Sequence, residues 1–266
     1  MAKIFKISAI TFLLLIVAGY TLGVESLAPF GWGLSLFIPA TIFLSCKNEG
    51  VLTSLIGVIT GVTAVSLISG IENGISISEM IIPGYAVFYL SEKNIRDGRL
   101  ALLLTLYFYL VSIGEDFYFG PPKDLSSLQM ILPFRWGIYF FSSAFFAVIV
   151  IGSITVIGKE KFIFRKINFG VIPVAVFILG GALSILKWFP QLQIIGANVT
   201  IAAAGFFLIQ GFAIAVSIID KLSPILRLIT FFVAVIFPIL GLLIITLLGL
   251  FDFWFDFRKL KKEVEK

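Results

Sequence analysis

The sequence predicts an all-α, polytopic bundle of transmembrane helices. Of its 266 residues, 59% are hydrophobic and only 13% are charged, whereas about 25% of the residues in a soluble domain are charged. The mean hydropathy is +1.10, and apolar stretches recur from end to end. These observations exclude a soluble enzyme, a disordered regulator and a disulfide scaffold. We expect one integral membrane domain over residues 1–266, with the lipid bilayer as a partner.

Nine apolar stretches are candidate membrane segments, because a helix needs about 20 apolar residues to cross about 30 Å of hydrocarbon. Six meet or nearly meet that length: residues 7–24, 51–71, 136–157, 169–189, 194–219 and 228–251. Three are shorter: residues 31–46, 75–90 and 100–113. Pro39 and Pro83 lie in the first two of these, so we expect kinked, broken or re-entrant helices there. The third lengthens only by including Glu115 and Asp116.

The positions of lysine and arginine predict the orientation in the membrane, because cytoplasmic loops carry an excess of both. With the N-terminus inside, the basic loops at Lys47, at 93–99 and at 159–166 lie in the cytoplasm. The loops at Glu25 and at 72–79 contain no lysine or arginine. These two loops are therefore expected on the outer side.

A short basic tail from about residue 258 limits the number of spans. Nine spans would place this tail outside, against the positive-inside rule. We therefore expect eight true spans plus one irregular segment, with both termini in the cytoplasm. The irregular segment is either 169–189, where Gly180 and Gly181 each lower helix propensity by about 1 kcal/mol, or 194–219, where polar side chains need protein or a cavity.

The composition also excludes several kinds of chemistry. Histidine is absent and Cys46 is the only cysteine, which removes haem, iron–sulfur, zinc and copper sites, a Cys–His nucleophile and internal disulfides. The sequence has no phosphate loop and no nucleophile elbow, so we expect no cofactor, no metal, no ATP hydrolysis and no enzyme activity. Basic loops account for the net charge of +5, so we expect no nucleic-acid partner.

Four residues are candidate ligand-binding residues: Asn198, Gln210, Glu115 and Arg135. The two amides lie in an otherwise apolar stretch, where they either contact a ligand or bond one helix to another, worth roughly 0.6–2 kcal/mol. Glu115 and Asp116 end the fifth segment, and Arg135 begins the sixth on the same predicted side. The acids are solvated interface residues, a cation-attracting mouth, or partners of Arg135.

The C-terminal end is a second candidate site, for a partner protein. Asp252 and Asp256 are four residues apart and so share one helix face, and Arg258 follows. Five aromatic residues between 251 and 257 fit an interfacial belt. The segment either anchors the last helix or docks a partner through these three charged residues.

The same terminus carries a resemblance to a known family. The matching residues are Gly249, Leu250, Asp252, Asp256 and Arg258, preceded by Asn198 and by Gln210-Gly211. In these residues the chain resembles the YybS-like family of uncharacterised bacterial multi-pass membrane proteins, whose last span tends to end in Gly-Leu-x-Asp followed by Asp-x-Arg. By fold, that family looks like the substrate-binding membrane subunits of energy-coupling-factor transporters. The resemblance implies a bacterial inner-membrane protein that uses a shared ATPase module.

The sequence leaves more than one hypothesis for function. The leading one is a small-molecule-binding membrane subunit of transporter type, which lacks its own ATPase and depends on a separate energising or regulatory protein. The alternative is a membrane scaffold or regulatory protein that recruits a partner through its cytoplasmic loops and the C-terminal Asp/Arg motif. A membrane-embedded enzyme that acts on lipid is the third.

Overall fold

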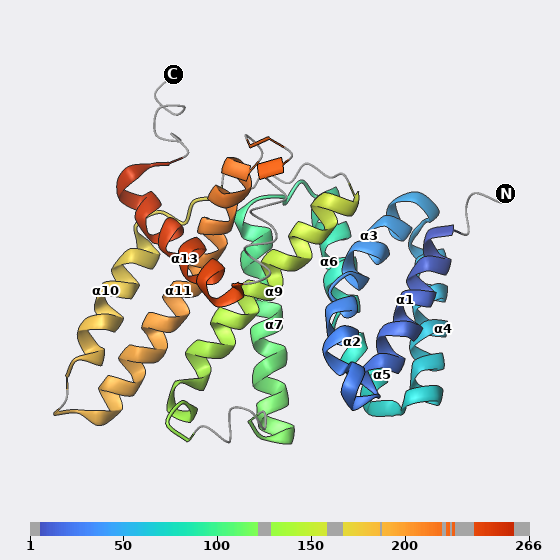
Figure 1. The fold of residues 1–266 in the computed structure, drawn as a ribbon, viewed down its shortest axis with the longest axis horizontal. Coiled ribbons are helices and arrows are strands. Elements are labelled where there is room, and N and C mark those ends of the chain that lie inside the picture. The colour runs from blue at the N-terminus through green and yellow to red at the C-terminus, as the bar shows by residue number, and fades with distance from the viewer. Residues whose placement is uncertain are drawn as a thin grey trace. The chain divides into compact units, whose positions relative to one another are not determined.

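The all-α prediction is confirmed for the part of the chain that the structure describes (Figure 1). This computed structural model describes residues 6–121, 129–158, 167–186, 188–219, 222–223, 225–226 and 237–257. The chain divides into two compact units. One unit comprises Met1–Arg96 with Ile149–Phe162, and the other comprises Asp97–Val148 with Ile163–Lys266.

Each unit has its own set of helices. The first contains α1 (Lys6–Leu22), η1 (Glu25–Leu27), α2 (Ala28–Ser35), α3 (Ile38–Glu49), α4 (Val51–Ser69), α5 (Ile71–Ser78) and α6 (Ile81–Glu92). The second contains α7 (Gly98–Phe119), η2 (Leu132–Phe134), α10 (Ile172–Ser184), α11 (Pro190–Ile219) and α13 (Pro238–Phe255). The remaining described helix, α9 (Arg135–Gly158), belongs to the second unit as far as Val148 and to the first unit from Ile149.

Within the described ranges, six helical stretches are long and apolar enough to cross a membrane, which is compatible with a multi-pass membrane protein. They are Val51–Ser69, Ile71–Glu92, Gly98–Phe119, Leu132–Gly158, Pro190–Ile219 and Pro238–Phe255. A seventh exists if the pair Ile7–Leu22 and Glu25–Ser35, bent by 120°, counts as one span. The expected count of eight or nine membrane segments is not confirmed.

Breaks beside prolines explain part of this difference. The expected segment 31–46 is divided between α2 and α3, and Pro39 lies in the first turn of α3. A proline is tolerated in the first turn because its missing N–H would have no partner within the helix there. The expected segment 75–90 is also divided, between α5 and α6, with Pro83 near the start of α6. This second break does not lower the count, because Ile71–Glu92 as a whole is one of the six stretches.

Three expected segments depart from their predicted lengths, two by being longer and one by being shorter. α7 begins at Gly98 after the capping residue Asp97, whose carboxylate accepts the Arg99 backbone N–H at 3.0 Å, and it continues past Glu115 and Asp116. α10 has 13 residues, or about 20 Å, which is shorter than about 30 Å of hydrocarbon. α11 covers 194–219 as part of one 30-residue helix, so the irregular segment by length is 169–189.

In the first unit, α1 and α4 approach closely because glycines lie at their contact. A side chain at Gly61 would collide with Leu15, and one at Gly19 would collide with Val65. Small residues at such contacts let helix backbones approach where lipid gives no hydrophobic drive for association. These glycines are therefore used for packing inside the chain.

A carboxylate from α3 caps the start of α1. Glu49 Oε1 accepts the Ile7 backbone N–H at 2.8 Å, and Oε2 accepts the Ser8 backbone N–H at 3.1 Å. The first N–H groups of a helix have no partner within it, and negative charge suits the positive end of the helix dipole. Burial raises the pKa of Glu49, but hydrogen bonds from Ser8 and Ile7 outweigh burial and hold the pKa below its ordinary value of 4.5.

We predict that Glu49→Gln lowers the melting temperature in detergent at neutral pH, because a helix cap contributes about 0.5–2 kcal/mol. Folding lowers the pKa of Glu49, so the ionised cap stabilises the protein above pH 4.5 and loses this effect as the pH falls through the lower folded-state pKa. The gap between wild type and variant should therefore shrink in acid. Glu92→Gln, at an exposed carboxylate, is the control. An equal gap at neutral and acidic pH would contradict the ionised cap.

In the second unit, α11 packs against both α10 and α13. Any side chain at Gly211 would collide with the backbone oxygen of Ile245, and any side chain at Gly249 would collide with the backbone oxygen of Phe207. The backbones of α11 and α13 thus touch at this crossing. Only glycine fits at Gly211 and Gly249 without moving one of the helices.

We expect Gly211→Ala to destabilise the protein by about 1–3 kcal/mol, the usual cost of inserting a methyl group into a tightly packed contact. Gly181→Ala is the matched control, because nothing lies within 4 Å of the added methyl group. Alanine is favoured over glycine inside a helix by about 1 kcal/mol, so the control should melt no lower than wild type. Thermal unfolding in detergent measures both, and an unchanged melting temperature for Gly211→Ala would refute the close crossing.

Candidate functional site

Asn198 joins α11 to the start of α9. Its Oδ1 accepts the Gly137 backbone N–H at 2.7 Å, and its Nδ2 donates to the carbonyls of Pro133 at 2.8 Å and Ile194 at 2.9 Å. The amide therefore caps the first turn of α9 and uses its acceptor and both donors within the protein. These hydrogen bonds are those expected if Asn198 bonds one helix to another. Ligand binding by Asn198 stays a prediction.

Gln210 and Asp252 meet between α11 and α13. Gln210 Nε2 donates to Asp252 Oδ2 at 3.0 Å, and both residues are only 5% exposed. Asp256 follows α13 with a left-handed backbone, φ 42°, which turns the chain so that the Phe257 N–H reaches Asp252 Oδ1 at 2.9 Å. Asp252 is therefore bonded within the chain on both carboxylate oxygens. Arg258 lies outside the described residues.

Asp116 and Arg135 form an ion pair between α7 and α9. Arg135 Nε lies 3.2 Å from Asp116 Oδ2, without the alignment of a hydrogen bond. The Tyr139 hydroxyl donates to Asp116 Oδ1 at 3.1 Å, and the Asp116 side chain is only 6% exposed. The Arg135 guanidinium also lies 4.7 Å from the centre of the Trp136 ring, a cation–π arrangement. The sequence left three alternatives for Glu115 and Asp116, and for Asp116 the structure shows the pairing with Arg135.

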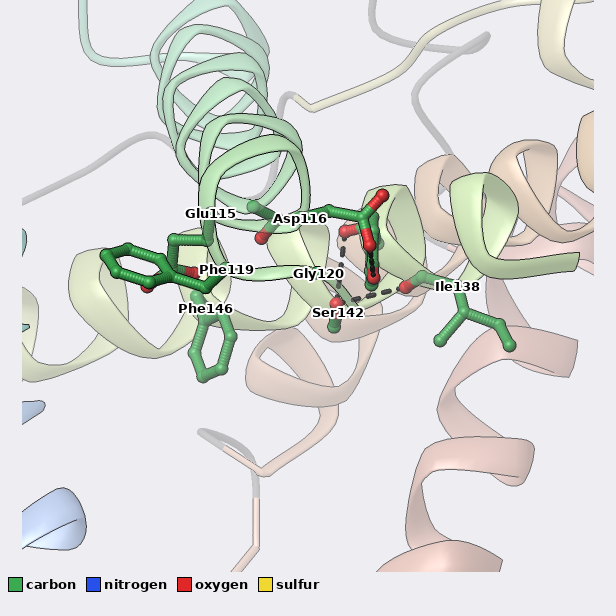
Figure 2. A pocket seen from close by; sticks show the side chains of 9 residues that line it. Glu115, Asp116, Phe119, Gly120, Ile138, Ser142 and Phe146 are labelled. Carbon is green, nitrogen blue, oxygen red and sulfur yellow. Dashed lines mark hydrogen bonds between the residues drawn. The ribbon is translucent and has the colours of Figure 1, made fainter. Parts of the chain in front are cut away.

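A pocket of about 470 Å³ is bounded by the end of α7 and the first turns of α9 (Figure 2). α7 contributes Ser112, Glu115, Asp116 and Phe119, and α9 contributes Ile138, Tyr139, Ser142 and Phe146. In Figure 2 the rings of Phe119 and Phe146 lie at one end of the pocket, and Asp116 and Ser142 lie towards the other. Ligand sites typically have volumes of about 300–1,000 Å³ and apolar walls with a few polar groups. This pocket has both properties.

Glu115 differs from Asp116 because it has no hydrogen bond or salt bridge within the described parts of the chain. Nearby in the lining, the Ser142 hydroxyl donates to the carbonyls of Ile138 and Tyr139, both at 3.0 Å. A hydroxyl oxygen in that position can still accept a hydrogen bond from a ligand. Among the polar residues of the lining, Glu115 therefore offers a carboxylate and Ser142 a hydroxyl acceptor.

Four residues that line the pocket were not predicted from the sequence: Phe119, Tyr139, Ser142 and Phe146. Their spacing carries a weak signal, because residues three or four apart share one helix face. Glu115 and Phe119 are so related on α7, as are Tyr139, Ser142 and Phe146 on α9. Nothing in one sequence indicates that these two faces adjoin the same pocket.

No protein-family model, curated protein or solved structure matches the chain. The resemblance to the YybS-like family therefore stays a prediction. Two of the residues that carry it, Gln210 and Asp252, form the buried contact between α11 and α13.

We predict that Gln210 and Asp252 stabilise the protein as a pair. Gln210→Ala and Asp252→Ala should each lower the melting temperature, because either change leaves a buried polar group without its partner, at about 1–3 kcal/mol. In a double-mutant cycle measured by thermal unfolding in detergent, the coupling energy should be about 0.6–2 kcal/mol, as for hydrogen bonds between membrane helices. Strictly additive losses would show that the two side chains are not coupled.

Proposed function

We propose that this multi-pass membrane protein is a small-molecule-binding subunit of transporter type that lacks its own ATPase. The observation that carries the proposal is the pocket beside Glu115, whose size and mixed lining suit a small molecule. Glu115 contacts the ligand, and Arg135 acts through Asp116 by holding that carboxylate in the wall. Asn198 and Gln210 serve as packing residues that keep α9, α11 and α13 in place.

The transporter-type role requires a separate source of energy. The sequence has no phosphate loop, so a partner ATPase supplies that energy in this proposal. The resemblance to the YybS-like family, and through it to energy-coupling-factor transporters, supports this division of labour. Binding of the small molecule is the part of the role that this chain performs.

We place the protein in the bacterial inner membrane with both termini in the cytoplasm. The cap of α1 supports this orientation for the N-terminal end, because the bonds from Ile7 and Ser8 to Glu49 put the start of α1 beside the end of α3. Lys6 and Lys47 therefore share one end of the first unit. The positive-inside rule assigns such basic segments to the cytoplasm.

The alternative role, a scaffold that recruits a partner, has less support. It needs the charged residues at the C-terminal end to be available to another protein. Asp252 is 5% exposed and bonded to Gln210, and this burial favours a packing role for it. Docking through Asp256, Arg258 and the cytoplasmic loops remains the competing hypothesis.

The proposal predicts that a small molecule is retained in the pocket of the purified protein. Native mass spectrometry from mild detergent should detect this molecule on wild type, and Ser142→Leu should lose it because the larger side chain enters the pocket. Thr60→Leu is the matched control: Thr60 also donates to carbonyls of its own helix but lies on an exposed surface of α4. Equal retention by wild type and Ser142→Leu would contradict binding in this pocket.

A further inference from the structure

The pocket lining carries an excess of negative charge. Both Glu115 and Asp116 line it, so two carboxyl groups face the same pocket. Arg135 compensates Asp116 at 3.2 Å, and Tyr139 donates a further hydrogen bond to it. Glu115 has no such partner among the described residues. One negative charge is therefore left for a ligand to meet.

Among the described residues around the pocket, the groups that would attract an anion are already engaged. The guanidinium of Arg135 pairs with the carboxylate of Asp116 and also lies 4.7 Å from the centre of the Trp136 ring. A free helix N-terminus would also bind an anion, but the Gly137 N–H at the start of α9 donates to Asn198 Oδ1 at 2.7 Å. Within the described part of the chain, a carboxylate or phosphate entering the pocket would meet Glu115 without a free cationic group to offset it.

The rest of the wall suits an apolar or aromatic body. Phe119, Phe146 and Ile138 line the pocket, and aromatic faces attract ammonium groups as well as apolar surface. Ser142 keeps an acceptor for an N–H donor, since its own proton is directed to carbonyls of α9. The end of α7 also presents the negative end of its helix dipole near Glu115, which favours a cation.

We infer that the pocket selects an organic monocation, with an ammonium group at Glu115 and an apolar or aromatic body between Phe119 and Phe146. This inference rests on the proposed small-molecule-binding function and adds the chemical class of the ligand. In the pocket, the ammonium group donates a charge-assisted hydrogen bond to Glu115 and a second hydrogen bond to Ser142 Oγ. These hydrogen bonds compensate for the contacts with water that the ammonium group loses. Arg135 and Tyr139 keep the neighbouring Asp116 in place.

The test measures the binding of three probes of similar size to the full chain in lipid nanodiscs. Isothermal titration calorimetry gives the affinity of each probe. Phenethylammonium is the cation, phenethyl alcohol the neutral analogue and phenylacetate the anion. A hydrogen bond to a charged group is worth about 1.5–3 kcal/mol, so the cation should bind at least about tenfold more tightly than the alcohol. Glu115→Gln should remove this preference. Glu25→Gln, at an exposed carboxylate of the first unit, should keep it.

Two further variants separate the possible failures. Phe119→Ala should weaken the binding of the cation and of the alcohol to the same extent. Melting temperatures check that each variant is folded. If alcohol or phenylacetate binds as tightly as the cation and Glu115→Gln changes nothing, the ligand class is refuted while small-molecule binding stands. If no probe binds and Ser142→Leu carries the same molecules as wild type in native mass spectrometry, both the ligand class and the proposed function are refuted.

Discussion

The second unit depends on one constraint: polar backbone groups at helix ends need partners, and an apolar surrounding offers none. A buried N–H without an acceptor costs about as much as a lost hydrogen bond. The chain meets this need with side chains from other helices. Asn198 of α11 accepts the Gly137 N–H at the start of α9, and Glu49 does the same for α1 in the first unit.

This use of polar residues changes how a rare amide or carboxylate in an apolar sequence is interpreted. Asn198, Gln210 and Asp252 stand out in the sequence as candidate sites, yet each has its hydrogen bonds inside the protein. Glu115 was also a candidate ligand-binding residue in the sequence, where it ends a segment beside aromatic residues. Its lack of a protein partner within the described ranges distinguishes it, and this makes the pocket the better place to look for function.

The fold class and the multi-pass character followed from composition, because the number of apolar residues needed to cross a bilayer is set by its thickness. The extension of α7 through Glu115 and Asp116, and the pairing of Asp116 with Arg135, were among the arrangements that the sequence allowed. The cap by Glu49 was not foreseen. A carboxylate next to basic residues at the end of a segment looks the same in sequence whether it is solvated or bonded to a helix 41 residues away.

Which helix faces adjoin was the information that the sequence lacked, and the proposed ligand binding depends on it. Asn198 holds the start of α9. There Tyr139 lines the pocket, and Arg135 and Tyr139 both contact Asp116. A change at Asn198 can therefore alter ligand binding without any contact between Asn198 and the ligand. Loss of binding in an Asn198 variant would identify a positioning residue, whereas Glu115 can be identified as a contact only if its substitution changes the preference among ligands of different charge. For this reason, a variant's preference among ligands of different charge distinguishes a ligand-contacting residue from a positioning residue better than its overall ligand affinity does.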